Sequence, residues 1–261
     1  MENKSQKEQK NKRIIIEARG LKKHFGGIRA VDDVSFKLYE SEILGIVGDN
    51  GAGKSTLIKL ITGAYKSDGG EVFLNGNRLE IQNTLQLRKL GIETVYQNQG
   101  LVENMNAPSN LFLGKEKVKP GLLGRVFKWL DKKFMKDETN ELLKKLNIEL
   151  KNFALPVKQL SGGQQQSVTI ARATYWKGKI TILDEPANNL GVEEQEKVLN
   201  LVRNLRENHN ISFIMITHNL EHVFGIADRI LVMRNGKIVG DKNVKETTRN
   251  EIVSLITGAF V

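Results

Sequence analysis

Cysteine is absent from this sequence, and so is any apolar run that approaches the ~18 residues a membrane-spanning helix needs. Without cysteine the protein has no disulfide framework, no thiolate metal site and no cysteine nucleophile. The N-terminal residues are polar and charged and lack the apolar stretch of a signal peptide, so we expect a cytoplasmic chain. No aromatic residue interleaves with the basic N-terminal residues and no nucleic-acid-binding signature is present, so we expect no nucleic-acid partner.

The chain is nevertheless large and basic. Its 261 residues, 39% of them hydrophobic, suffice for one large α/β domain or for one domain with a subdomain. The net charge of +10 is uneven, because residues 115–151 carry eleven Lys/Arg against six Asp/Glu and residues 1–13 carry five against two. We expect residues 1–13 to be a disordered basic tail. A basic excess is typical of nucleic-acid binding, of contact with anionic lipid, or of a solvated lysine-rich surface, and we favour the solvated surface.

A glycine-rich stretch between an apolar strand and a helix is the strongest signal in the sequence. Residues 43–47 predict a buried strand and residues 57–61 the start of a helix, which is the context that a phosphate-binding P-loop requires. Glycines let backbone N–H groups approach phosphate oxygens, and the helix N-terminus adds a partial positive charge. Lysine supplies a full charge and the serine hydroxyl a hard ligand for Mg²⁺. The loop consists of Gly48, Asp49, Asn50, Gly51, Ala52, Gly53, Lys54, Ser55 and Thr56.

Two further apolar runs end in residues that suit nucleotide hydrolysis. Residues 179–183 predict a buried strand that ends at Asp184 and Glu185, and residues 211–217 predict another that ends at His218. Ligands of parallel sheets bind at the carboxyl ends of the strands. We expect Asp184 to hold Mg²⁺ and Glu185 to orient and deprotonate an attacking water. The remaining histidines lack this placement and are expected on the surface or in packing: His24, His209 and His222.

Two other features leave alternatives open. Ser161, Gly162, Gly163 and Gln164 lead a helix that is expected to run through residue 173. They fit an ordinary Ser-x-x-Gln capping box, or a second anion site made by a hydroxyl, glycine backbone and a helix N-terminus. Phe25 lies on a polar turn, where it is either a stacking platform for a base or a loop aromatic tucked into the local core.

The remaining pattern predicts an α/β core interrupted by a helical insertion. Apolar residues near 126, 127, 130 and 134 share a helical face opposite Lys and Arg, which fits a helix packed on protein or, less well, a segment near lipid headgroups. Elsewhere we expect strands at 14–18, 34–38, 71–77 and 92–96, turns at 22–27 and 69–70, helices at 81–90, 139–146 and 192–208, a hairpin turn at 235–236, and a final helix at 251–256 capped by Thr248.

From about residue 14 to its end, the chain resembles an ATP-binding cassette (ABC) ATPase. The matching elements occur in the family's order: an aromatic at Phe25, the P-loop, a Q-loop glutamine at Gln97, the signature Leu160-Ser161-Gly162-Gly163-Gln164, the pair Asp184-Glu185, and a switch histidine at His218. The resemblance implies a RecA-like α/β core with an antiparallel β subdomain and an inserted helical subdomain. The core lobe would be residues 14–97 and 165–261, and the helical subdomain residues 98–164.

The resemblance also implies the chemistry. ATP and Mg²⁺ are the expected cofactors. The implied catalytic residues are Lys54, Gln97, Glu185 and His218, and the implied Mg²⁺ ligands are Ser55, Gln97 and Asp184. The implied nucleotide contacts are Phe25, the P-loop from Gly48 to Thr56 and, from a second copy of the chain, Ser161, Gly162, Gly163 and Gln164. One P-loop and one signature per chain therefore imply a homodimer with two ATP molecules.

Four further segments resemble the monosaccharide-importer branch of that family, and their similarity is less specific than that of the catalytic motifs. They are residues 104–116, 160–173, 190–191 and 217–230. Such a protein would sit at the cytoplasmic face of the membrane, drive permease subunits and act indirectly with an extracytoplasmic sugar-binding protein. The sequence departs from the wider family at Ala187, Asn188, Asn189 and Gly191, which leaves coupling between the two sites open. The alternatives are a branched-chain amino acid importer, a soluble ABC ATPase acting on nucleic acid or ribosomes, and a nucleotide-gated scaffold that does not hydrolyse ATP.

Overall fold

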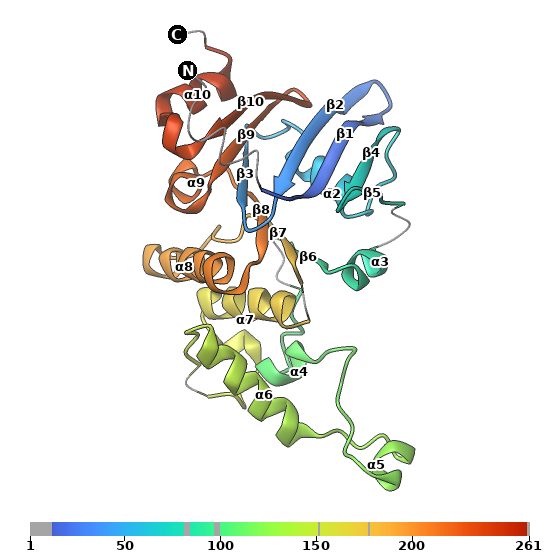
Figure 1. Ribbon diagram of the computed structural model, residues 1–261. Coiled ribbons are helices and arrows are strands. Elements are labelled where there is room, and N and C mark those ends of the chain that lie inside the picture. The colour runs from blue at the N-terminus through green and yellow to red at the C-terminus, as the bar shows by residue number, and fades with distance from the viewer. Residues whose placement is uncertain (1–11, 81–83, 97–99, 151, 177, 260–261) are drawn as a thin grey trace.

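The protein consists of two sheets at one end and a lobe of helices at the other (Figure 1). The computed structural model describes residues 12–80, 84–96, 100–150, 152–176 and 178–259. The predicted tail therefore falls almost entirely outside the described residues, as does Gln97. Among the residues that are described, no helix is long and apolar enough to span a lipid bilayer.

The central sheet has six strands in the order β10-β9-β3-β8-β7-β6. All neighbours are parallel except β10, which pairs antiparallel with β9. Continuous apolar runs such as β3 and β8 are buried along their whole length, as strands covered on both faces must be. The strands are β3 (Ile43–Val47), β6 (Ile92–Val95), β7 (Ile180–Asp184), β8 (Ser212–Ile216), β9 (Arg229–Arg234) and β10 (Lys237–Asn243).

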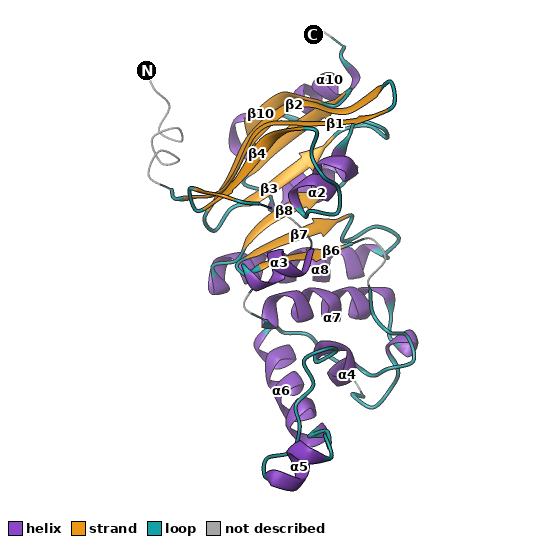
Figure 2. Ribbon diagram, turned by 90° about the vertical axis from the view of Figure 1, so that its right-hand side faces the viewer, coloured by secondary structure: helices purple, strands orange, loops and turns teal. Residues whose placement is uncertain are grey.

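A second, antiparallel sheet has the order β2-β1-β4-β5. It consists of β1 (Ile14–Phe25), β2 (Ile28–Tyr39), β4 (Gly69–Leu74) and β5 (Asn77–Arg78). Helix α2 (Lys54–Ile61) lies between the two sheets (Figure 2), and its buried face shares one apolar cluster with strands of both. The P-loop that precedes α2 is therefore fixed by the packing of both sheets.

The helical lobe lies below the parallel sheet in Figure 1. Helix α7 packs against α4 and α6 on one side and against α8 and β6 on the other, so it joins the lobe to the sheet. The helices are α3 (Thr84–Lys89), α4 (Ala107–Leu111), α5 (Leu122–Val126), α6 (Lys132–Lys145), α7 (Gly162–Tyr175), α8 (Val192–His209), α9 (Leu220–Ile226) and α10 (Arg249–Thr257), with 3-10 turns η1 (Val157–Gln159) and η2 (Val244–Glu246).

Most predicted helices and strands are confirmed, as are a predicted turn and a predicted helix cap. The predicted turn at 235–236 joins β9 to β10, and within the segment predicted as strand 71–77 a turn at Asn75 joins β4 to β5. Asn75 and Asn235 both have the positive φ that such turns require. The Thr248 side chain caps α10 by accepting a hydrogen bond from Glu251 N. The predicted helix 81–90 is α3, with residues 81–83 outside the described part. The predicted domain boundary at 164/165 falls within the first turn of α7.

Two predicted turns are wrong. The expected turn at 22–27 is mostly strand, because β1 continues to Phe25 and only Gly26 and Gly27 turn the chain. The expected turn at 69–70 is the start of β4, where Gly70 has a φ of 83° and an added Cβ would collide with the Gly20 carbonyl. This glycine therefore permits close backbone approach at an irregular strand pairing, where Arg19 and Lys22 pair out of register.

The predicted amphipathic helix over 124–134 is also wrong. The chain leaves α5 at Val126, takes a left-handed conformation at Lys128 (φ 50°), and begins α6 only at Lys132. All four apolar residues of the pattern are exposed, although Phe134 meets Phe112 edge-on with a centroid distance of 6.3 Å. The segment therefore does not bury a face in this protein.

Candidate functional site

The P-loop takes a backbone path that only glycine allows at several positions. Gly48, Gly51 and Gly53 have φ values of 152°, 82° and 102°. An added Cβ at Gly48 would collide with the carbonyl of Met233, and one at Gly53 with the carbonyl of Ala30. The loop is therefore pressed between β9 and β2, which leaves its N–H groups arranged around the start of α2.

Lys54 is the one buried cation of the loop. Its Nζ donates to the carbonyl oxygens of Gly48 at 2.7 Å and Asp49 at 2.9 Å. Burial lowers the pKa of this amine, and the opposing negative charges of nearby carboxylates do not cancel that effect. Both hydrogen-bond partners are neutral, so the positive charge of Lys54 remains available to an anion bound in the loop.

A cleft of about 550 Å³ opens over the P-loop. Phe25 lines it, is 45% exposed, and meets Tyr65 edge-on at a centroid distance of 5.5 Å. Ser55 also lines the cleft and is exposed. Because nearly half of Phe25 is exposed at the cleft wall, its ring is suited to stacking on a base. Its edge contact with Tyr65 also gives it a local packing role. The stacking role itself stays a prediction.

Asp184, Glu185 and His218 are brought together at the ends of neighbouring strands. Asp184 pairs with Ile216 of β8, and Glu185 N donates to the Ile216 carbonyl at 2.9 Å. The Glu185 Oε1 atom accepts from His218 N at 3.1 Å and lies 2.8 Å from His218 Nδ1. Glu185 has a φ of 52°, a left-handed conformation that turns the chain immediately after the strand. The carboxylate is therefore held by the main chain and the ring of the histidine.

The carboxylates fit a magnesium site that also uses phosphate oxygens. Burial, followed by the negative charge of Glu185, raises the pKa of Asp184, so a nearby cation would stabilise its ionised form. Among the described residues, no group of three or more His, Cys, Asp or Glu side chains is placed to hold a metal alone. Mg²⁺ commonly binds through one or two carboxylates, a hydroxyl and substrate phosphates, and Ser55 and Asp184 supply donors of that kind.

The predicted capping box at the start of α7 is confirmed. Ser161 Oγ accepts from Gln164 N at 3.3 Å, and Gln164 Oε1 accepts from Ser161 N at 3.1 Å. An added Cβ at Gly163 would lie 2.8 Å from the Cβ of Glu194, so this glycine lets α7 approach α8 closely. The hollow beside Ser161 shares no lining residue with the P-loop cleft. The alternative anion-binding role of this segment stays a prediction.

His222, expected on the surface or in packing, is buried, with Nε2 3.0 Å from Gln195 Oε1 and 3.1 Å from Asn219 Nδ2, and burial lowers its pKa. One feature beside the site was missed from the sequence. A groove of about 510 Å³ between α3, β6, α4 and α7 contains Glu93, whose pKa is raised by burial, and Arg172. The groove has no local sequence signal, because its lining residues come from distant segments.

The geometry defines a P-loop nucleotide-binding protein with acidic and histidine residues beside the loop. A family model described as ABC transporter matches residues 31–188, more than half of the chain. The chain is 42% identical to the fructose import ATP-binding protein FrcA of Rhizobium meliloti, over 94% of both chains. It is 39% identical to the xylose/arabinose import ATP-binding protein XylG of Sulfolobus acidocaldarius, over 93% and 94%. The chain belongs to the ABC transporter family of ATP-binding proteins.

Other similarities agree with this assignment. The ribose import ATP-binding protein RbsA of Clostridium tetani is 34% identical over 97% of this chain, which spans about half (48%) of that relative. The ATP-binding cassette MJ1267 in its ADP conformation is 28% identical, with a TM-score of 0.77 over 94% of this chain and 96% of that one. The cassette MJ0796, solved as a dimer, gives 26% and 0.72 over 89% and 100%. The predicted α/β fold class and the prediction of an ABC ATPase are confirmed.

Proposed function

We propose that this protein is the ATP-hydrolysing, energy-coupling subunit of an ABC importer for a monosaccharide. The observation that carries the ATPase part is the Glu185–His218 contact beside a P-loop whose lysine is held on neutral carbonyls. The similarity to proteins named for fructose and xylose/arabinose import supports the sugar part. The relatives described above are named for sugar import, which favours a sugar over the alternative of a branched-chain amino acid.

In this mechanism each part of the site has a separate task. Lys54 and the P-loop N–H groups bind the β- and γ-phosphates of ATP. Ser55 and Asp184 would hold Mg²⁺, which when bound neutralises charge on the phosphate oxygens. Glu185 orients the attacking water and accepts its proton. His218 fixes Glu185 through the contacts to Oε1 and would contact the γ-phosphate of bound ATP. Gln97, outside the described residues, would complete the Mg²⁺ ligands.

The proposed active form is a homodimer in which Ser161 of one copy covers ATP on the P-loop of the other. Within one chain, the hollow beside Ser161 and the P-loop cleft are lined by different residues, which supports a signature contributed by a second copy. The dimeric form named for MJ0796 is consistent with this arrangement. Each site is then incomplete in a single chain, as in assemblies that place an active site at a two-fold interface.

A mixing experiment tests the shared site. Lys54→Ala and Ser161→Arg are each expected to abolish ATPase activity as homodimers. Equal amounts mixed should recover about a quarter of the wild-type rate, because about half of randomly paired dimers are mixed and each contains one intact site. No recovery, with both proteins folded and able to dimerise, would refute a shared site that works independently of the second site.

We propose that the permease docks in the groove containing Glu93 and Arg172, at the joint of the helical lobe and the sheet.

The substrate is tested in a reconstituted complex of this protein with its permease. ATPase activity of the complex with its permease and binding protein should rise when a monosaccharide is added. Stimulation by branched-chain amino acids alone would refute the sugar assignment while leaving the ATPase assignment intact. Docking on the permease would make this protein a peripheral one, bound to the cytoplasmic face of the membrane.

A further inference from the structure

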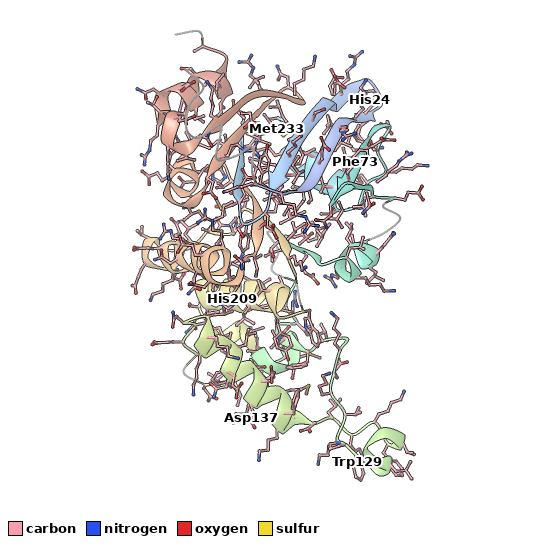
Figure 3. The ribbon with its side chains drawn as sticks, in the orientation of Figure 1. His24, Phe73, Trp129, Asp137, His209 and Met233 are labelled. Carbon is pink, nitrogen blue, oxygen red and sulfur yellow. The ribbon has the colours of Figure 1, made fainter. Side chains whose placement is uncertain are left out.

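The outermost part of the helical lobe is a small hairpin, residues 117–131, which we call the tip hairpin. Lys119 N donates to the Trp129 carbonyl at 2.7 Å, and Asp131 N donates to the Lys117 carbonyl at 2.7 Å. Helix α5 lies at its far end, and Trp129 is at this end of the molecule, away from both sheets (Figures 1 and 3). The hairpin is therefore a defined backbone structure that projects from the lobe.

The tip hairpin exposes large apolar side chains. Leu122 is 80% exposed, Val126 64%, Phe127 59% and Trp129 55%. The rings of Phe127 and Trp129 stack on each other, with centroids 5.5 Å apart and an interplanar angle of 24°. Each ring thus covers part of the other and still presents an apolar face to the outside. Neighbouring exposed apolar side chains on a projecting end are typical of an interaction surface.

The same region is strongly basic. The tip hairpin contains four basic residues, Lys117, Lys119, Arg125 and Lys128, against one acidic residue, Asp131. The Asp131 carboxylate accepts a hydrogen bond from Phe134 N at 3.0 Å. The charge that the hairpin presents to a partner is therefore positive.

We propose that the tip hairpin binds the surface of an anionic lipid bilayer, with Phe127 and Trp129 at the headgroup level and the lysines on lipid phosphates. Aromatic rings favour the membrane interface because they combine an apolar body with a polar or polarisable edge. Lysine stems lie along apolar surface while their amines reach the phosphates. Stacked exposed aromatics next to basic side chains complement a surface that is negatively charged outside and apolar beneath, which is the surface of an anionic bilayer. Each lysine near such a surface contributes about fivefold to the binding constant.

The test uses the full chain without permease or nucleotide. Large unilamellar vesicles of phosphatidylcholine with about 30 mol% phosphatidylglycerol should sediment the wild-type protein, and vesicles of phosphatidylcholine alone should sediment much less. The double variant Phe127→Glu/Trp129→Glu should bind the anionic vesicles at least about tenfold more weakly. The matched control is Val253→Glu, a 44% exposed position on α10, which should bind as wild type does. Residues 1–13 are present in every protein, so their charge affects all of them equally.

A second variant separates lipid binding from misfolding. Lys117→Gln/Lys119→Gln/Lys128→Gln changes no apolar residue and should reduce binding to anionic vesicles without affecting the unfolding temperature. Unchanged vesicle binding in both variants would overturn the proposal. A separate binding assay uses detergent-solubilised permease. If the double variant lost permease binding but still bound vesicles, the proposal would also be overturned, because the surface would then be a protein contact. Since the vesicle assay contains neither ATP nor permease, its result is independent of the proposed transport function.

Discussion

Replacing Glu185 by glutamine isolates proton transfer from the rest of the site. The glutamine amide has nearly the shape of the carboxylate, and its oxygen can accept the hydrogen bond from His218 N that Glu185 accepts at 3.1 Å. The P-loop and Lys54 are untouched, so ATP affinity should stay within a few fold of wild type. What disappears is the group that accepts the proton of the attacking water.

The expected loss follows from that single change. General-base catalysis is worth about 10²–10⁴ in rate, which corresponds to about 3–5 kcal/mol in the activation free energy. Steady-state phosphate release should therefore fall to about 1% of wild type or less. Because ATP then binds without being consumed, size-exclusion chromatography with ATP and Mg²⁺ should show a stable dimer of Glu185→Gln and only a transient one of wild type.

A nearby carboxylate serves as the control. Glu221, at the start of α9, is 73% exposed in its side chain and contacts Arg249 at 3.3 Å. Glu221→Gln removes the same charge close to His218 and should hydrolyse ATP at nearly the wild-type rate. If Glu185→Gln instead turns over ATP at the wild-type rate, Glu185 is not the base and the proposed roles of the strand-end residues are wrong.

Three further predictions concern the cleft, the acidic pair and a buried ion pair. Phe25→Ala should weaken ATP binding by about 1–3 kcal/mol, measured by titration calorimetry, whereas Phe73→Ala on the same antiparallel sheet should leave affinity unchanged. Asp184→Asn should abolish hydrolysis yet raise the unfolding temperature of the nucleotide-free protein, because the raised pKa of Asp184 means that folding penalises its charge. That gain should be full above the folded pKa and shrink as the pH falls through it; a lower unfolding temperature at neutral pH would contradict the assignment. Arg229→Met should cost about 3–5 kcal/mol in urea unfolding, since it leaves the buried carboxylate of Glu42, 2.8 Å from Arg229 Nε, without its partner.

The sequence predicted those features of the site whose causes are local. Strand 43–47, the glycines of the P-loop and the helix from Lys54 follow from residue types within about twenty positions. The Ser161 cap is equally local. Strand-end placement of Glu185 and His218 was also predictable, because parallel strands present their carboxyl ends at one edge. Their 2.8 Å contact was not predictable, since it depends on β7 and β8 being neighbours in the sheet.

The errors have a common physical origin in contacts between distant residues. The spacing of residues 126, 127, 130 and 134 fits a helix, but the backbone bond between Lys119 and Trp129 closes a hairpin instead. Periodicity reports which side chains could share a face and contains no information on such closure. Likewise, Gly69 and Gly70 read as a turn until β1 is placed beside them, when they become part of a paired strand. The buried Arg229–Glu42 ion pair links positions 187 residues apart and had no signal at all.

The order of the central sheet separates the two chemical halves of the site. Strand β8 lies between β3, which leads into the phosphate loop, and β7, which carries the carboxylates. Two interstrand steps of about 4.8 Å place these halves about 10 Å apart. The phosphate loop and the carboxylates therefore reach the site from two non-adjacent strands. Lys54 and Asp184 still attract each other across it, since each charge favours the ionised form of the other.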